Sequence, residues 1–217
     1  MIPNKKAYIF DLDGTLFESM DVWSKIDTAF FKKRRIPHPD GFTASILAMN
    51  FDEAANYTKT LLGLNESTDE IKQEWLDMAI HAYSHEVDMK PYAKEYLLSL
   101  KAKGHALAVA TSLPVELMTP ALHKHEIYHI FDVICTASEV GCGKSKPDIF
   151  VLTAKKLGLP PQDCLHFDDI LAAVKSATSI GMEVCAVYDK TSANDWDEIK
   201  NIADHSIMGF KDIYCYL

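Results

Sequence analysis

The sequence predicts a doubly wound, parallel α/β sheet that carries an all-helical insert after its first strand. Short apolar runs without polar alternation recur along the chain, as expected for strands that are covered on both faces. From residue 91 onward these runs alternate with helical patterns, and that order is typical of a parallel sheet. Residues 19–89 do not follow this alternation, because they contain helical patterns and no convincing strand.

The expected strands and helices of the core follow from local signals. Five apolar runs are predicted as strands, and they cover residues 7–10, 106–110, 133–135, 164–167 and 184–187. Apolar residues between Ala93 and Leu100 keep helical spacing, and Gly104 is placed to close that helix. A second helix is expected to begin after Pro147 and to end at Gly158.

The insert is predicted to form a separate helical cap domain. Its two apolar stripes consist of Val22, Ile26, Ala29 and Phe30, and of Ile71, Trp75, Met78, Ala79 and Ala82. Ser67 fits the N-cap of the second helix, since acidic residues follow in the first turn. Roughly seventy residues are too many for an ordinary crossover between strands. We therefore expect residues 1–18 and 90–217 to form the core domain and residues 19–89 to form the cap.

The composition argues against several classes of protein. The 217 residues are 48% hydrophobic and 24% charged, which is the balance of an ordinary globular protein. A net charge of −9 argues against a nucleic-acid groove, which needs clustered Lys and Arg. No segment is long and apolar enough for a membrane span, and residues 1–10 lack the apolar stretch of a signal peptide. The five cysteines form no Cys-x-x-Cys pair, so we expect a reduced, cytoplasmic protein.

The first candidate site is the run Asp11-Leu12-Asp13-Gly14-Thr15, directly after the first expected strand. Two carboxylates one residue apart at the end of a strand can share one cation, and one of them can attack phosphorus. Gly14 permits a sharp turn and Thr15 offers a hydroxyl. An ordinary turn is the structural alternative, because Asp-Gly pairs are common turn formers.

Two further segments carry groups that suit a phosphate. Thr111 and Ser112 follow the second expected strand, where a hydroxyl and the next backbone N–H groups could bind phosphate oxygens; capping of a helix is the alternative. Lys144 lies on a glycine-rich approach to a helix, where its charge can neutralise a carboxylate nucleophile and an incoming phosphate. Lys146 is the competing candidate for that role.

Asp168 and Asp169 follow the fourth expected strand. Two adjacent acids beside an apolar strand are costly unless a cation lies between them. Together with Asp11 and Asp13 they supply the hard oxygen ligands that Mg²⁺ prefers. Because the carboxyl ends of parallel strands share one edge of a sheet, the four sites are expected to form one constellation.

With these residues the chain resembles the haloacid dehalogenase superfamily over nearly its whole length. The likeness is closest to the branch of phosphatases and β-phosphoglucomutase-like enzymes, which have a Rossmann-like core and a helical cap of the C1 type. The run from Asp11 to Leu16 matches the first motif of the family in full. Thr111 matches the second motif, Lys144 the third, and the pair Asp168-Asp169 the fourth.

The resemblance implies a role for each acid. Asp11 attacks the phosphoryl group and forms an aspartyl-phosphate, and Asp13 acts first as general acid and then as general base. The implied ligands of Mg²⁺ are the Asp11 carboxylate, the Asp13 backbone carbonyl and Asp169, with Asp168 either a ligand or the partner of one. Metal and lysine together offset the repulsion between an anionic nucleophile and an anionic phosphate.

The expected activity is Mg²⁺-dependent hydrolysis of a small phosphate monoester, such as a sugar phosphate or a similar metabolite. A β-phosphoglucomutase-like phosphomutase is the alternative. Similar mutases carry a His in the first cap helix and a Gly-x-x-Arg on a cap loop. Here Trp23 occupies the expected His position and residues 48–51 contain no Arg, so water is the expected acceptor.

Two other functions are less favoured. Dehalogenases of this superfamily normally lack the second acid of the first motif, which Asp13 supplies here. A non-catalytic module is disfavoured because every catalytic position is filled. Glu18, Ser19 and Trp23 lie near the expected cap entrance and are candidate substrate contacts. The expected partner is a small phosphorylated metabolite rather than a nucleic acid or a membrane, and the chain is expected to be a monomer or a weak oligomer.

Overall fold

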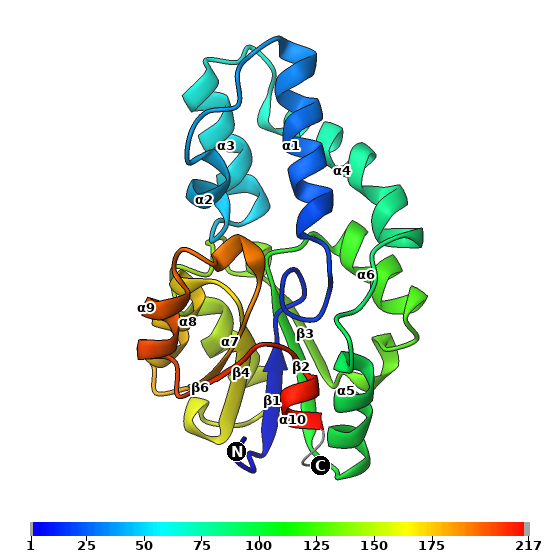
Figure 1. The fold of residues 1–217 in the computed structure, drawn as a ribbon, viewed down its shortest axis with the longest axis vertical. Coiled ribbons are helices and arrows are strands. Elements are labelled where there is room, and N and C mark those ends of the chain that lie inside the picture. The colour runs from blue at the N-terminus through cyan, green and yellow to red at the C-terminus, as the bar shows by residue number, and fades with distance from the viewer. Residues whose placement is uncertain (1, 215–217) are drawn as a thin grey trace.

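A six-stranded parallel sheet forms the centre of the molecule (Figure 1). The computed structural model describes residues 2–214 of the chain. The strands are β1 (Ala7–Phe10), β2 (Ala106–Thr111), β3 (Val133–Thr136), β4 (Cys164–Asp168), β5 (Glu183–Val187) and β6 (His205–Ile207). Their order in the sheet is β3-β2-β1-β4-β5-β6, which is that of a doubly wound fold. The predicted fold class is therefore confirmed.

The sixth strand is missing from the sequence prediction. It comprises only three residues, and it pairs with β5 alone at the edge of the sheet. Its sequence, His205-Ser206-Ile207, contains no continuous apolar run. An edge strand needs no such run, so apolar runs alone could not reveal it.

Helices cover both faces of the sheet. One face is covered by α5 (Ala93–Ala102), α6 (Val115–Lys124) and α10 (Lys211–Tyr214), and the other by α7 (Asp148–Lys156), α8 (Leu171–Thr178) and α9 (Trp196–Ile202). Four short 3₁₀ turns, η1 (Tyr128–Ile130), η2 (Ala137–Glu139), η3 (Pro161–Asp163) and η4 (Lys190–Ser192), lie between these elements. Successive strand residues serve opposite faces, so Tyr8 and Phe10 pack in one apolar cluster and Ala7 and Ile9 in the other.

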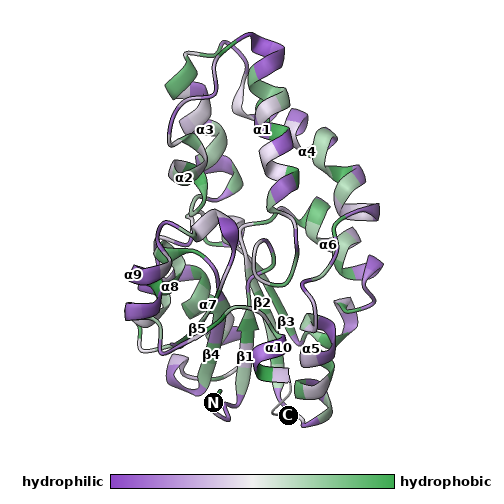
Figure 2. Ribbon diagram, viewed as in Figure 1, coloured by the Kyte–Doolittle hydropathy of each residue, from purple (hydrophilic) through white to green (hydrophobic). Residues whose placement is uncertain are grey.

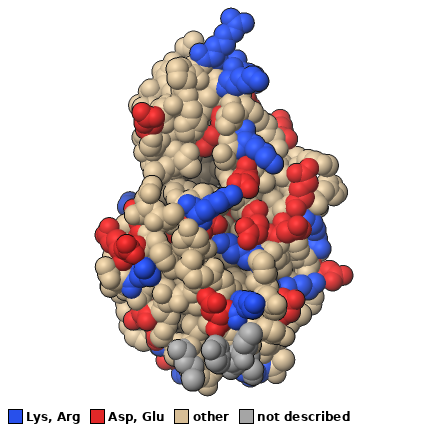
Figure 3. Space-filling view, viewed as in Figure 1, with Lys and Arg blue, Asp and Glu red and all other residues tan. Residues whose placement is uncertain are grey.

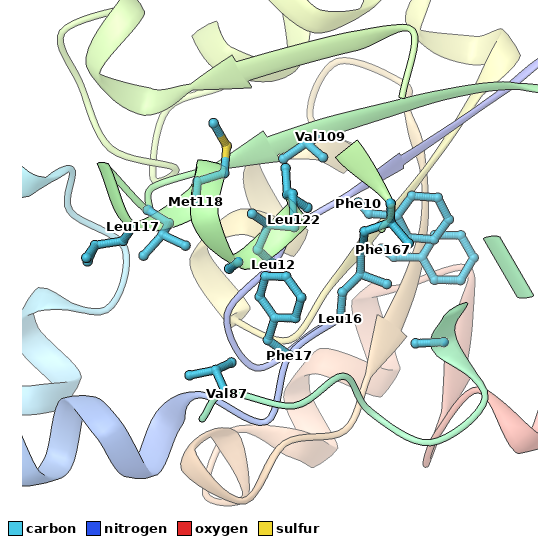
Figure 4. Packing of buried hydrophobic residues seen from close by; sticks show 14 of the residues in the cluster. Phe10, Leu12, Leu16, Phe17, Val87, Val109, Leu117, Met118, Leu122 and Phe167 are labelled. Carbon is cyan, nitrogen blue, oxygen red and sulfur yellow. The ribbon is translucent and has the colours of Figure 1, made fainter. Parts of the chain in front are cut away.

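The strands are apolar along most of their length, as their burial on both faces requires (Figure 2). Phe10 of β1 stacks on Phe167 of β4, with ring centroids 4.7 Å apart, and both are labelled in Figure 4. This contact joins the two central strands just before the acidic segments that follow them. The expected helix after Pro147 is confirmed as α7, which ends ahead of Gly158.

Four helices separate β1 from α5, and Figure 1 places them over the carboxyl ends of the strands. They are α1 (Met20–Arg34), α2 (Phe42–Ile46), α3 (Phe51–Leu62) and α4 (Thr68–His85). Ser67 caps α4 as predicted, because its hydroxyl accepts from the Glu70 backbone N–H while Glu70 accepts from the Ser67 backbone. The exact division of the chain at residues 18/19 and 89/90 stays a prediction.

Two chain segments connect these helices to the sheet and run side by side. Phe17 and Met89 form an antiparallel bridge, and the Glu18 backbone N–H donates to the Asp88 carbonyl at 2.9 Å. Lys90 ends the second segment inside the core. Its Nζ donates to Asp189 Oδ2 at 3.1 Å and to the Tyr188 carbonyl at 2.8 Å. This buried ion pair anchors the returning connection.

Within residues 2–214, no helix combines the length and the apolar character that crossing a membrane requires. Cys135, Cys142, Cys164 and Cys185 are buried and free. The fifth cysteine, Cys215, lies outside the described residues.

The anchor at Lys90 can be tested by neutralising its partner. Asp189→Asn keeps the shape of the side chain and leaves a buried ammonium without its counter-charge, so we expect a loss of about 3 kcal/mol in the free energy of unfolding. Urea denaturation measures it. Asp21→Asn is the matched control, because it breaks a Lys–Asp pair (Lys190 to Asp21, 2.6 Å) whose side chains are 64% and 69% exposed. Equal unfolding midpoints for the two variants would contradict the anchoring role.

Candidate active site

The predicted site residues meet at the carboxyl ends of the central strands. The order of the sheet reverses between β1 and β4, and such a switch point is where open α/β sheets bind ligands. Asp11 extends β1 by one more ladder bond, from its backbone N–H to the Phe167 carbonyl at 3.0 Å. Leu12, Leu16 and Phe17 of the same loop are buried in the apolar cluster shown in Figure 4. Packing of these apolar side chains fixes the loop that carries Asp11.

Three carboxylates come together at this point. Asp11, Asp168 and Asp169 are buried, and one oxygen from each lies within 4.8 Å of the others. Thr15 Oγ1 donates to Asp169 Oδ1 at 3.0 Å and so orients that carboxylate. Gly14 makes the approach possible, because it has φ +75° and a Cβ there would overlap the Asp169 carboxylate.

The cluster carries more negative charge than its protein neighbours compensate. Burial raises the pKa of Asp11 to about 7, although Lys144 opposes the shift. Burial also raises the pKa of Asp169 well above its usual range, and the nearby charges of Asp168 and Asp11 add to this effect. A cation among the carboxylates would offset the free-energy cost of ionising Asp11 and Asp169 in the buried cluster. Carboxylate oxygens are hard ligands that suit a divalent ion such as Mg²⁺. The residues present therefore fit a metal centre.

Lys144 is the cation that the chain itself supplies to the cluster. Its Nζ lies 2.5 Å from Asp11 Oδ1 and 2.9 Å from Asp168 Oδ2, and its side chain is 2% exposed. Burial alone would lower the pKa of Lys144, but the two carboxylates raise it above its ordinary value. The ammonium therefore stays charged. Lys146, the competing candidate, is exposed to solvent.

Asp168 differs from its neighbour because both of its oxygens are already bonded. Oδ2 accepts from Lys144 and lies 2.9 Å from His166 Nε2, and Oδ1 accepts from the Ile170 backbone N–H at 3.1 Å. Burial opposes ionisation, yet Lys144 and His166 outweigh it and lower the pKa of Asp168 to about 2. Asp168 is thus placed to orient Lys144.

The Asp13 side chain is not part of the carboxylate cluster and is bonded by other groups. Oδ1 accepts from Ser19 Oγ at 2.6 Å and from Tyr83 Oη at 2.7 Å, and Oδ2 accepts from Trp23 Nε1 at 3.1 Å. Burial raises the pKa of Asp13 despite these three hydrogen bonds. Both carboxylate oxygens of Asp13 accept hydrogen bonds from the cap side of the site. Only the backbone carbonyl of Asp13 therefore remains as a predicted metal ligand.

A cavity of about 130 Å³ connects this centre to the cap helices. Figure 3 shows a hollow in the surface between the cap helices and the part of the molecule that contains the sheet. Asp11, Thr111, Ser112 and Lys144 line its lower end. The Ser112 hydroxyl is buried without a hydrogen-bond partner among residues 2–214, and Thr111 Oγ1 accepts from the Leu113 backbone N–H, which leaves its proton free. Both hydroxyls can therefore donate to an anion in the cavity.

The three candidate substrate contacts have different surroundings. Glu18 is exposed and does not line the cavity, since it lies on the connection beside Asp88. Ser19 is fully buried and uses its hydroxyl on Asp13, and it does not line the cavity either. Trp23 does line it. Residue type and spacing do not specify the direction of each side chain, so the sequence prediction could not distinguish these three residues.

The cap also contacts the loop that carries the lysine. The Gly143 backbone N–H donates to Glu53 Oε2 at 2.8 Å, and the same carboxylate oxygen accepts from the Asn50 backbone N–H. A Cβ at Gly143 would overlap the Ala48 carbonyl and the Met49 backbone. Glycine is therefore required where the cap loop meets the residue before Lys144.

Comparison with known proteins assigns the chain to a family. The model of the haloacid dehalogenase-like hydrolases matches residues 5–181. The chain belongs to this family. Hexitol phosphatase A of Escherichia coli is 30% identical over 186 residues, which cover 84% of this chain and 82% of the relative. A phosphorylated carbohydrates phosphatase of Thermotoga maritima is 25% identical over 178 residues, 82% of each chain.

The fold is shared with solved structures of the same kind. A variant of CbbY from Rhodobacter sphaeroides, in complex with xylulose-(1,5)bisphosphate, superposes with a TM-score of 0.84 at 19% identity, covering 97% of this chain and 96% of that one. At this identity the likeness shows the fold alone. The haloacid dehalogenase-like fold thus extends beyond the matched residues to nearly the whole chain.

Several residues of this haloacid dehalogenase-like site are absent from the sequence prediction. Tyr83 and Glu53 contact the site from cap helices, and no local pattern marks such long-range contacts. His166 had a weak signal, because a titratable residue inside an otherwise apolar strand needs a polar partner. It has two, Asp168 and the Ile9 carbonyl at 3.2 Å.

Gly143→Ala tests whether the contact between the cap loop and the lysine loop matters for activity. The added methyl group would displace the Ala48 backbone or Lys144, and a displacement of about 1 Å lowers kcat/KM on the order of a hundredfold. Steady-state kinetics with p-nitrophenyl phosphate measure the loss. Gly209→Ala is the control, because its Cβ would meet no described atom within 4 Å. Wild-type kcat/KM in Gly143→Ala would show that the contact is dispensable.

Proposed function

We propose that this haloacid dehalogenase-like hydrolase is a Mg²⁺-dependent phosphatase that hydrolyses a small phosphate monoester through an aspartyl-phosphate on Asp11. One observation carries the proposal. The Asp11 carboxylate lines a cavity that also presents the Lys144 ammonium and the free hydroxyls of Thr111 and Ser112. These are a nucleophile and three donors for a dianionic phosphoryl group. The relatives, phosphatases of phosphorylated carbohydrates and hexitols, support the same reaction.

The reaction can be followed on the residues of this chain. An Asp11 oxygen attacks phosphorus while Lys144, Thr111 and Ser112 bind the phosphoryl oxygens. The bond from phosphorus to the alcohol oxygen breaks, and Asp13 donates a proton to the departing oxygen. Asp13 then removes a proton from water, which attacks phosphorus and regenerates Asp11 with release of inorganic phosphate. Mg²⁺, held by Asp11 and Asp169, would offset the repulsion between nucleophile and phosphate.

Water is the proposed acceptor rather than a second sugar phosphate. Trp23 stands where similar mutases carry a His, and its indole N–H is only a donor, here to Asp13. It cannot relay a proton to a bound intermediate. The cap loop at residues 48–51 offers no Arg for a second phosphate. A β-phosphoglucomutase-like activity therefore has no support of its own.

A cytoplasmic location and a monomeric or weakly oligomeric state complete the proposal. Four buried, free cysteines suit a reducing compartment. No nucleic acid is proposed as a partner, because the net charge of −9 disfavours a polyanion.

The nucleophile is tested with p-nitrophenyl phosphate and Mg²⁺. Asp11→Asn removes the attacking oxygen's charge, so we expect the rate of phosphate release to fall on the order of a thousandfold or more. Asp195→Asn changes an exposed acid away from the cavity and should retain the wild-type rate. Equal rates for wild type and Asp11→Asn would exclude the covalent mechanism. Faster conversion of β-glucose 1-phosphate to the 6-phosphate than release of phosphate would favour the mutase.

The metal centre is tested by stability rather than by activity. Without Mg²⁺, Asp169→Asn should unfold at a higher urea concentration than wild type, because burial and its neighbours raise the pKa of Asp169 and its charge therefore opposes folding. Mg²⁺ at a hundred times its Kd should stabilise wild type by about 2.7 kcal/mol and should stabilise Asp169→Asn far less. An equal effect of Mg²⁺ on both proteins would place the ion elsewhere.

A further inference from the structure

The upper part of the cavity has a chemistry that the phosphatase reaction does not use. Its wall is mostly apolar and includes Trp23, Phe51, Trp75, Ile26 and Met49. Three of these are aromatic and adjacent, with ring centroids 6.3 Å apart for Trp23 and Phe51 and 5.5 Å apart for Phe51 and Trp75. A leaving group with a hydroxyl on every carbon would lose its water here and regain only the few hydrogen bonds that groups such as Trp75 Nε1–H, which has no partner among residues 2–214, can donate.

One acid interrupts this apolar wall. Asp27 lines the same cavity and is 6% exposed. It lies four residues after Trp23 on α1, so it is about 6 Å further from the core along the helix. Since Trp23 Nε1 bonds Asp13, Asp27 faces the end of the cavity away from the phosphate.

The two oxygens of Asp27 have unequal surroundings. Oδ2 accepts from Thr43 Oγ1 at 3.3 Å and lies 3.9 Å from His38 Nε2, so it links α1 to α2 and to the loop before α2. Oδ1 accepts no hydrogen bond from any residue of the described range 2–214. These contacts account for Oδ2 and leave Oδ1 without a hydrogen bond in a residue that lines the cavity. No Lys or Arg of that range forms an ion pair with Asp27.

We infer that the substrate is a phosphate monoester of an apolar, ring-sized alcohol that ends in an ammonium group, which Asp27 Oδ1 binds. This inference rests on the proposed phosphatase function and names its substrate class. The aromatic faces of Trp23, Phe51 and Trp75 accommodate the ring and also attract a cation. The ammonium adds a counter-charge at Asp27 Oδ1, whereas His38 lies 3.9 Å from Oδ2. It is bound at the end of the cavity away from the phosphate at Lys144.

The test compares two esters that differ only in the terminal charge. They are 4-(2-aminoethyl)phenyl phosphate and 4-propylphenyl phosphate, whose chains have the same number of heavy atoms. In wild type, kcat/KM should be about tenfold or more higher for the ammonium ester, since a charge-assisted hydrogen bond is formed only with it.

Asp27→Asn should bring the ratio of the two esters close to one, because the amide keeps the bond to Thr43 and loses the charge. Asp40→Asn is the matched control: it removes an equal charge from an exposed position in the loop between α1 and α2 and should leave the ratio unchanged. A wild-type ratio near one, or an equal ratio in wild type and Asp27→Asn, would overturn the inference while leaving the phosphatase function in place.

Binding without turnover separates this inference from the proposed function. Calorimetry should show that wild type binds the alcohol 4-(2-aminoethyl)phenol about tenfold more tightly than 4-propylphenol, and that Asp27→Asn does not discriminate. If no ester were hydrolysed but this preference held, the phosphatase proposal would fail and the ammonium subsite would stand. Equal binding of both alcohols to wild type would overturn the subsite.

Discussion

Three carboxylates buried at one edge of a sheet repel one another. Among residues 2–214, the positive charge that forms ion pairs with them is the Lys144 ammonium, apart from the contact of His166 with Asp168. The lysine reaches Asp11 and Asp168 but forms no ion pair with Asp169, so the compensation is uneven. Asp168 ionises readily, whereas the pKa values of Asp11 and Asp169 are raised. Asp11, the proposed nucleophile, therefore lies on the side of the cluster where a further cation is needed. The same imbalance that costs stability would provide affinity for a metal ion.

The position of the lysine also makes the site dependent on the cap. Gly143, the residue before it, is in contact with the backbone of residues 48–49 and with Glu53. On the other side of the cavity, Trp23 and Tyr83 bind the carboxylate of Asp13. The cap thus contacts both the loop that carries Lys144 and the side chain of Asp13, the proposed acid–base group. Displacing the cap would disturb both at once, and the reaction would require the arrangement in which they are formed.

Sequence alone could locate Asp11, Lys144, Asp168 and Asp169 near one another, because parallel strands bring their carboxyl ends to one edge and strands are visible as apolar runs. It could not find β6, whose three residues have no such run. Nor could it place Tyr83, which meets Asp13 across 70 positions of the chain. Contacts of this kind depend on how helices pack over the sheet, and the apolar stripe of a helix does not specify which polar residue at its border points inward.

The cavity has opposite charges at its two ends, and this arrangement restricts which phosphate esters can bind. Lys144 and the proposed metal site would attract the phosphate at one end, while Asp27 lines the other end with one oxygen that accepts no hydrogen bond from residues 2–214. An ester with a second phosphate would meet Asp27 and be repelled, whereas one with an ammonium group fits in a single orientation. The overall charge of −9 also opposes the approach of dianions, and an ammonium reduces that penalty. Hydrolysis would then separate the two charges of the proposed substrate, so that the cationic alcohol is held only by Asp27 and the aromatic wall, and the phosphate by the core.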